Sequence, residues 1–187
     1  MRIASVVTAF GLAAAAFTLP AAAQNAAGKW YLGYTAGQSK YNLNCTGSCT
    51  DTGAGFTLFG GVNLHPNVAV EFGYGDMGKS TFGASNVRAT LWQISGVGSW
   101  WFGSRRQFGA YGRLGAYTGE LKSTTPSTGA EIKHGTTNME YGVGAQWNLS
   151  SKFGTRLEWT RFQSMGGGGF NQSADVDLIA LGITYTF

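Results

Sequence analysis

Charge, cysteine and long apolar runs are all scarce in this chain of 187 residues. Only 12% of the residues are charged, and there are two cysteines and two histidines. Beyond the first 23 residues, no stretch approaches the roughly 18–20 unbroken apolar residues of a transmembrane helix. The basic residues are scattered, whereas a nucleic-acid groove needs a basic stripe, so we expect no nucleic-acid partner.

Residues 1–23 predict a secretory signal peptide. Arg2 gives a positive start, Ile3–Leu19 is an apolar run, and Ala21–Ala23 form a small-residue cleavage site before Gln24. A membrane-spanning helix is the alternative, but the run is rich in alanine and no stop-transfer charges follow it. Cleavage leaves 187 − 23 = 164 residues, and 24–187 are enough for one domain.

Glycine and aromatic residues are abundant. The chain has 30 glycines, about twice the usual share of ~7%, together with 6 tryptophans, 8 tyrosines and 12 phenylalanines. The glycines alternate with aromatic and β-branched residues instead of forming low-complexity repeats. This combination is typical of crowded β-strands.

Eight segments alternate with a period of two residues, and no helical periodicity of useful length lies between them. They are Trp30–Lys40, Gly55–Leu64, Val68–Met77, Val87–Phe102, Phe108–Glu120, Asn138–Leu149, Phe153–Phe162 and Val176–Phe187. Short links alternate with long ones, the long ones being Tyr41–Ala54, Gly78–Asn86, Leu121–Thr137 and Gln163–Asp175. The pattern predicts an all-β, antiparallel up-and-down meander with short turns at one end and long loops at the other.

The two faces of these strands differ in size and polarity. In the last strand Ile179, Leu181 and Ile183 share one face, and small residues such as Ala180 and Gly182 share the other. A soluble calycin-type barrel would put the bulky face inside and Glu71, Arg156 and Glu158 on the wet outer wall. Glycine-rich strands suit that arrangement poorly, because an exposed glycine weakens a strand.

A membrane barrel inverts the arrangement, with the bulky face toward lipid and the small or polar face filling a narrow interior. Ten residues tilted by ~40° span about 25 Å, the height of an outer-membrane apolar band. Aromatic residues are expected in the interfacial girdles: Trp30, Trp100, Trp101, Phe108, Trp147, Phe153, Tyr185 and Phe187 near the short turns, and Tyr74, Tyr117 and Trp159 near the long links. We therefore predict a closed eight-stranded antiparallel transmembrane β-barrel.

The fourth strand fits this scheme least well. If Val87, Ala89, Leu91 and Val97 face lipid, Gln93 and Ser95 do so too, while Trp92 and Ile94 point inward. A β-bulge near Gln93–Gly96 would shift the phase.

Several segments resemble the OmpA-type transmembrane domain and its stand-alone OmpX-type relatives. They are Lys29–Gly37, Val70–Gly78, Tyr111–Gly119, Thr155–Phe162 and Leu181–Phe187, and their order and spacing cover essentially the whole mature chain. The resemblance implies an outer-membrane protein of a Gram-negative bacterium, in contact with lipopolysaccharide and phospholipid, with long loops extracellular and short turns periplasmic. It also implies that Ile183, Tyr185 and Phe187 form the signal read by the outer-membrane assembly machinery. Because the chain ends at the last strand, we expect no appended periplasmic domain.

Glu71, Arg113, Arg156 and Glu158 are the candidate lumen charges, and buried charges must pair because desolvation is costly. They predict a salt-bridge plug or, alternatively, a gate whose pair exchange admits small ions. The resembled family has such a network, and Glu71, Arg113 and Arg156 match it. The family resemblance leads one to expect a further Lys and Glu, but this chain has Gly96 and Gln146 at those positions. This departure counts against the gate interpretation.

The remaining candidates lie in the predicted long links. Cys45 and Cys49 predict a local disulfide in an exported chain, since a metal would need more ligands nearby, and we expect no metal and no cofactor. His134 with Ser123 or Ser127 leaves a lipid A-modifying enzyme as a third possibility, although no spacing compels a triad. The loops, including Gly166–Gly169 and Ser123–Lys133, are candidates for binding a host or phage ligand, or are unspecialised.

Overall fold

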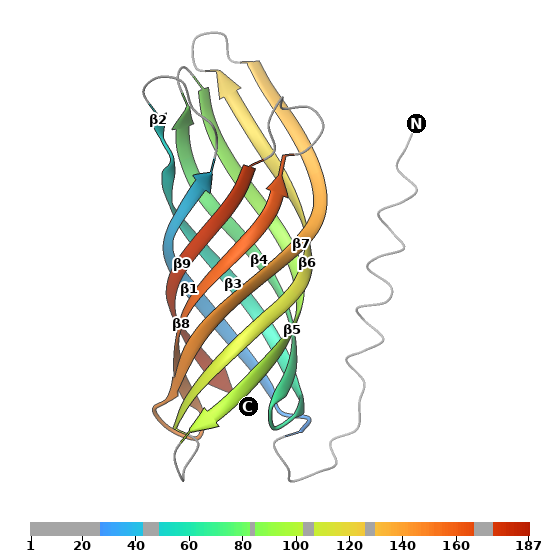
Figure 1. Ribbon diagram of the computed structural model, residues 1–187, viewed down its shortest axis with the longest axis vertical. Helices are drawn as coiled ribbons and strands as arrows, with labels where there is room; N and C mark the ends of the chain where they lie inside the picture. The colour runs from blue at the N-terminus through green and yellow to red at the C-terminus, as the bar shows by residue number, and fades with distance from the viewer. Residues whose placement is uncertain (1–26, 43–48, 83–84, 103–106, 126–129, 167–173) are drawn as a thin grey trace.

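A computed structural model describes residues 27–42, 49–82, 85–102, 107–125, 130–166 and 174–187. Its strands are β1 (Trp30–Asn42), β2 (Cys49–Thr50), β3 (Thr52–His65), β4 (Val68–Phe82), β5 (Ser85–Phe102), β6 (Phe108–Thr125), β7 (Ala130–Asn148), β8 (Phe153–Met165) and β9 (Ala174–Thr186). Each of the eight long strands pairs antiparallel with the next, and β9 pairs with β1. The predicted closed eight-stranded barrel is confirmed, and two-residue β2 adds to the edge of β4 (Figure 1).

The end of the chain is part of the barrel wall. β1 and β9 pair continuously from Tyr31 opposite Thr186 to Asn42 opposite Asp175. The backbone N–H of Phe187 donates to the carbonyl of Trp30 at 2.9 Å. The two strands lie side by side (Figure 1), so the apolar C-terminal stretch closes the sheet and leaves no free edge there.

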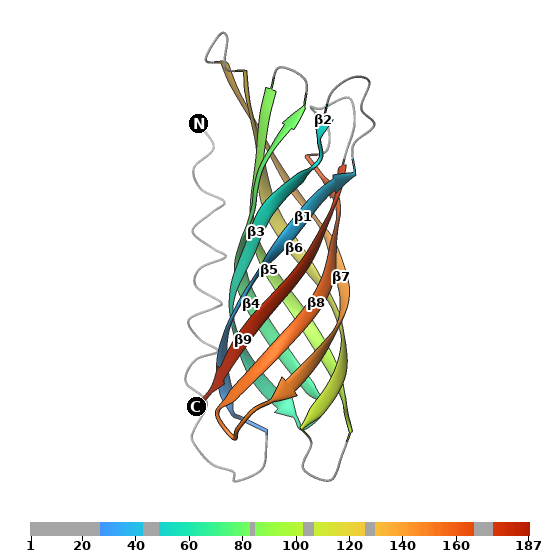
Figure 2. The ribbon, with the colours of Figure 1, turned by 90° about the vertical axis from the view of Figure 1, so that its left-hand side faces the viewer.

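The strands run further into the predicted long links than the sequence indicates. The link expected over Gly78–Asn86 is mostly strand, since β4 reaches Phe82 and β5 begins at Ser85; the link over Leu121–Thr137 is also mostly strand. Threonine and serine there continue the ladder, as β-branched threonine does readily. The β6–β7 hairpin projects furthest from the barrel, at the end opposite the C-terminus (Figures 1 and 2).

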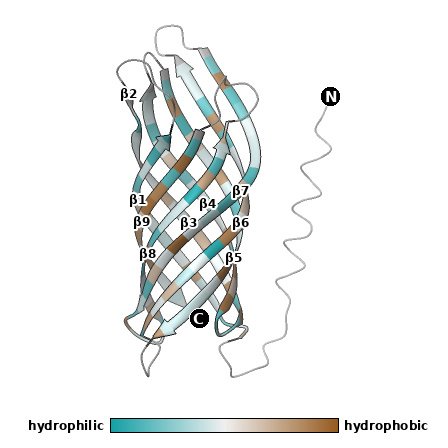
Figure 3. Cartoon of the chain, in the orientation of Figure 1, coloured by the Kyte–Doolittle hydropathy of each residue, from teal (hydrophilic) through white to brown (hydrophobic). Residues whose placement is uncertain are grey.

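Bulky apolar side chains cover the outer wall, as predicted. The following are about half exposed or more: Leu32, Leu58, Phe72, Ile94, Leu114, Val143, Leu157, Leu181 and Ile183. Their neighbours along each strand point into the barrel, and hydropathy alternates along the ribbons (Figure 3). No helix in the described residues is long and apolar enough to cross a membrane.

The expected phase of the fourth strand is wrong. In β5, Val87, Ala89, Leu91 and Val97 are buried inside the barrel, whereas Trp92 and Ile94 are about half exposed on the outer wall. β5 pairs with β6 without a shift from Asn86 to Phe102, so there is no bulge near Gln93–Gly96. The lumen beside β5 changes from polar to apolar along its length, which explains why polarity alone misplaced the strand.

Two predicted girdle aromatics also lie elsewhere. Tyr117 is 1% exposed inside the barrel, where its ring meets the edge of Phe162. Trp101 lies on the inward phase of β5, and its Nε1 donates to the carbonyl of Pro66 at 3.1 Å. Trp101 lies near the end of β5, as predicted, whereas Tyr117 lies in the middle of β6 because that strand continues to Thr125. Both are on the inner face, because position along a strand does not fix which face a side chain takes.

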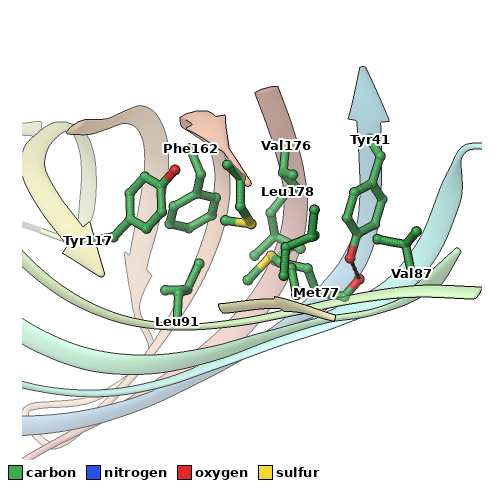
Figure 4. Packing of buried hydrophobic residues seen from close by; sticks show 12 residues of the cluster. Tyr41, Met77, Val87, Leu91, Tyr117, Phe162, Val176 and Leu178 are labelled. Carbon is green, nitrogen blue, oxygen red and sulfur yellow. Dashed lines mark hydrogen bonds between the residues drawn. The ribbon is translucent and has the colours of Figure 1, made fainter. Parts of the chain in front are cut away.

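The half of the lumen toward the long links is filled by an apolar cluster, which we call the apolar plug. Its members are Tyr41, Met77, Val87, Ala89, Leu91, Tyr117, Leu121, Phe162, Met165, Val176, Leu178 and Ala180, all at most 3% exposed. Figure 4 shows the side chains meeting across the barrel, with the Tyr41 hydroxyl donating to the carbonyl of Met77. These side chains are as closed off from solvent as those of a protein core.

The lumen as candidate functional site

Strand alternation brings the four predicted lumen charges to the same level of the barrel. Glu71 comes from β4, Arg113 from β6, and Arg156 and Glu158 from consecutive inward positions of β8. All four are at most 4% exposed. Charges from strands on opposite sides of the barrel therefore meet in its centre.

Arg113 links three carboxyl groups. Its Nη2 lies 3.3 Å from Oε2 of Glu71 and 3.8 Å from Oε1 of Glu140, and its Nη1 lies 3.5 Å from Oε2 of Glu158. Nη2 also donates to Oγ of Ser95 at 3.0 Å. The guanidinium thus bridges β4, β5, β7 and β8.

Arg156 lies nearer the short turns and is held between aromatic rings. Its Nη1 is 2.9 Å from Oε1 of Glu71 and 4.0 Å from Oε2 of Glu158. The guanidinium carbon lies 4.8 Å from the ring centre of Phe59 and 4.6 Å from that of Tyr111, a cation–π arrangement. A Cβ added to Gly144 would lie 2.4 Å from the Tyr111 ring, so the glycine of the inner wall makes room for the ring that encloses Arg156.

Sequence reasoning missed Glu140 and its polar neighbours. Ser95 Oγ lies 2.5 Å from Glu140 Oε1. With the amide of Gln93 turned so that its nitrogen faces Glu140, Nε2 donates to Oε2 at 2.9 Å. The inward phase of Glu140 is readable from its strand, but its two polar neighbours lie on β5, whose phase was inverted. Gly96 faces outward instead, and Gln146 donates to Ser99 nearer the short turns.

Tyrosine and threonine hydroxyls complete the cluster. Tyr31 donates to Glu71 at 2.7 Å, Tyr111 donates to Glu158 at 2.8 Å, and Thr35 donates to Glu158 at 3.2 Å. Three carboxyl groups face two guanidinium groups, which leaves an excess of one acidic group if all are ionised. Glu140 is the carboxyl group furthest from a guanidinium, and it accepts hydrogen bonds mainly from the neutral side chains of Ser95 and Gln93.

A family model described as the outer membrane protein beta-barrel domain matches residues 9–187. The chain belongs to this family. It is 26% identical to outer membrane protein A of Escherichia fergusonii and to that of Shigella dysenteriae over 191 aligned positions, covering 96% of this chain and 54% of each relative. The chain thus spans about half the length of these relatives.

Solved structures of small outer-membrane barrels share the fold of this outer membrane β-barrel protein. Ail of Yersinia pestis has a TM-score of 0.61 at 16% identity, covering 86% of this chain and 99% of Ail. Neisserial surface protein A has a TM-score of 0.63 at 12% identity, covering 84% and 97% of the two chains. These likenesses show the fold of the barrel and say nothing about its ligands.

The other predicted residues of the outer membrane barrel lie apart from the lumen cluster. Ile183 and Phe187 are exposed on the outer wall, and Tyr185 meets the edges of Phe153 and Phe187. His134 lies in β7 opposite Leu121, not in a loop. Cys49 lies in β2, whereas Cys45, Ser127 and the proposed signal peptide lie outside the described residues.

Proposed function

We propose that this outer membrane barrel has a structural and surface-interaction role, with long strand ends extracellular, short turns periplasmic and a closed lumen. The observation that carries the proposal is that the lumen is blocked at two successive levels. The charged cluster fills its centre, and the apolar plug fills the half toward the long links. An ion entering the plug would lose its hydration without gaining polar partners, a cost of several kcal/mol.

The projecting β6–β7 hairpin is the natural recognition surface in this orientation. It extends beyond the rest of the barrel (Figure 2), and its outer face carries Lys122, Lys133, Glu120 and Glu131 in pairs at 3.6 and 3.1 Å. Surface residues on such an extension are free of packing constraints and can meet a host or phage ligand. Ail, which shares the fold, has been solved in complex with the heparin analogue sucrose octasulfate.

The alternative, a gated ion channel, is tested by single-channel recording in planar bilayers. We expect no steady conductance from the purified barrel. Steady conductance that changes in Arg156→Ala would favour the channel and contradict the closed lumen. In parallel, replacing residues 122–133 by a short turn keeps Leu121 of the apolar plug and its ladder partner His134. This variant should fold but should not support adhesion of expressing cells to a host-cell surface, if the hairpin is the recognition element.

We also propose that the protein is not an enzyme. Ser123 is buried and pairs with Ile132, while His134 pairs with Leu121, so the two are not opposite each other in the ladder. Lipid A from expressing cells should keep all its acyl chains. Loss of a chain that is abolished by His134→Ala would contradict this proposal.

The assembly signal and the disulfide remain part of the proposal. Ile183, Tyr185 and Phe187 present an apolar, partly aromatic surface at the closing strand, which the outer-membrane assembly machinery would bind. Cys45 and Cys49 are close enough in sequence to form a small ring in an oxidising compartment. Mass spectrometry after thiol alkylation without reduction tests the ring, and labelling of both thiols would exclude it.

A further inference from the structure

A cavity lined by both polar and apolar side chains opens at the short-turn end of the lumen, below the charged cluster. It has a volume of about 500 Å³, within the range of small-molecule sites. The turn residues Ser150 and Lys152 form part of its rim, and Arg156 lies at its inner end. We call it the vestibule.

The charge of the vestibule has one sign. Among the described residues that line it, Lys29, Lys152 and Arg156 are cationic and none is acidic. The acidic groups of the lumen cluster lie deeper, beyond Arg156, as the order of inward positions along β4, β7 and β8 requires. A cleft lined by one sign of charge with low-dielectric walls concentrates solutes of the opposite sign.

Arg156 retains hydrogen-bonding capacity despite its burial. It is 3% exposed, and its Nη1 is paired with Glu71 at 2.9 Å, but its Nε has no hydrogen-bond partner. Buried donors without partners are rare in folded proteins and call for a ligand or water. A planar guanidinium recognises carboxylate and phosphate groups through paired N–H donors.

The walls of the vestibule supply neutral hydrogen-bonding groups. Asn63, Gln146 and Thr184 are among its lining residues, with the Gln146 amide donating to Ser99 at 3.2 Å. Amides and hydroxyls suit a hydroxylated or amide-bearing molecule, whereas the cations suit its acidic group. The walls therefore match a small polar solute with one anionic group better than a bare apolar ligand.

We propose that the vestibule binds a small anionic solute through a carboxylate or phosphate group directed at Arg156, with Lys29 and Lys152 guiding it at the rim. In the orientation proposed above, the vestibule opens to the periplasm. The binding itself needs no conducting lumen and no extracellular ligand, so it is independent of the surface role. A free solute and a phospholipid headgroup share this chemistry.

The test uses the folded full barrel in uncharged maltoside micelles, titrated with inorganic phosphate and with succinate while backbone amide resonances are followed. Saturable shifts are expected at Gly154, Thr184 and other vestibule residues. Lys29→Gln and Lys152→Gln should each raise the apparent Kd about two- to five-fold, because each removes one exposed charge. Lys133→Gln, on the projecting hairpin, removes the same charge far from the vestibule and should leave the Kd unchanged.

A second experiment distinguishes a free anion from a phospholipid headgroup as the ligand. The same shifts in nanodiscs containing phosphatidylglycerol, but not with free phosphate or succinate in micelles, would assign the site to a lipid headgroup and still support an anion site. Shifts that stay linear with concentration, or that weaken equally in Lys133→Gln, would overturn the proposal. Neither variant touches the lumen cluster, so loss of folding does not confuse the result.

Discussion

Nη2 of Arg113 lies 3.3 Å from Oε2 of Glu71 in the centre of the barrel, and both side chains are closed off from solvent. Without Glu71, the Arg156 guanidinium keeps only Glu158, at 4.0 Å, and removing one partner of a buried ion pair typically costs about 3–5 kcal/mol. Glu71→Gln should therefore lower the free energy of unfolding by about that amount, because Glu71 is the carboxyl that both guanidinium groups approach. Urea unfolding of the barrel folded into lipid vesicles measures it. An unchanged unfolding midpoint would show that the pair contributes nothing.

Glu140→Gln should behave differently from Glu71→Gln. Three carboxyl groups share two guanidinium groups, and Glu140 lies 3.8 Å from Arg113 while resting on Ser95. The amide keeps the shape and removes the excess acidic group, so the free energy of unfolding should stay the same or rise by up to about 1 kcal/mol. The same urea experiment compares the two variants, and equal destabilisation by both would show that Glu140 is as firmly paired as Glu71.

The seam between the first and last strands leaves no room at Gly37. A Cβ there would lie 1.9 Å from the carbonyl oxygen of Ile179 and 2.6 Å from Cα of Ala180, both backbone atoms that cannot rotate away. Gly37→Ala should destabilise the barrel by about 1–3 kcal/mol, as overpacking does. Gly98→Ala is the matched control, because a Cβ on Gly98 meets nothing within 4 Å. If both variants unfold at the same urea concentration, the seam tolerates the extra methyl group.

The apolar plug should matter for stability more than for conduction. Phe162 is fully buried, with its ring against the edge of Tyr117. Phe162→Ala should lower the free energy of unfolding by about 3–5 kcal/mol through the cavity it leaves. Planar-bilayer recordings of the same variant should still show no steady conductance, since the charged cluster lies intact below. Conductance in Phe162→Ala alone would identify the plug as the sole barrier.

Phe187 tests the assembly signal. Its side chain is exposed on the outer wall and meets Tyr185 edge to face, while its backbone N–H closes on Trp30. Phe187→Ser keeps the backbone bond and removes the aromatic surface, so the fraction of heat-modifiable, folded barrel in cells should fall. Thr186→Ser, one residue earlier, is the control and should assemble normally. Equal assembly of both variants would place the signal elsewhere.

The amino-acid sequence by itself determined the class of the fold and the inversion of its faces. Alternation with a period of two residues shows that bulky apolar groups share one face of each strand. The other faces are rich in glycine and carry Glu71, Arg113 and Arg156, which requires a narrow polar interior. These are local properties, because the period of a strand is fixed by its backbone.

Only the tertiary structure decided which inner residues meet. Leu91 is apolar because it faces the plug, and Gln93 is polar because it faces the charged centre, so polarity along β5 reports the level in the lumen instead of the face of the strand. The stagger of neighbouring strands brings Ser95 to Glu140 and leaves a one-signed vestibule beneath Arg156. These contacts depend on the register of the eight strands around the closed barrel. The sequence of a single strand does not contain that information.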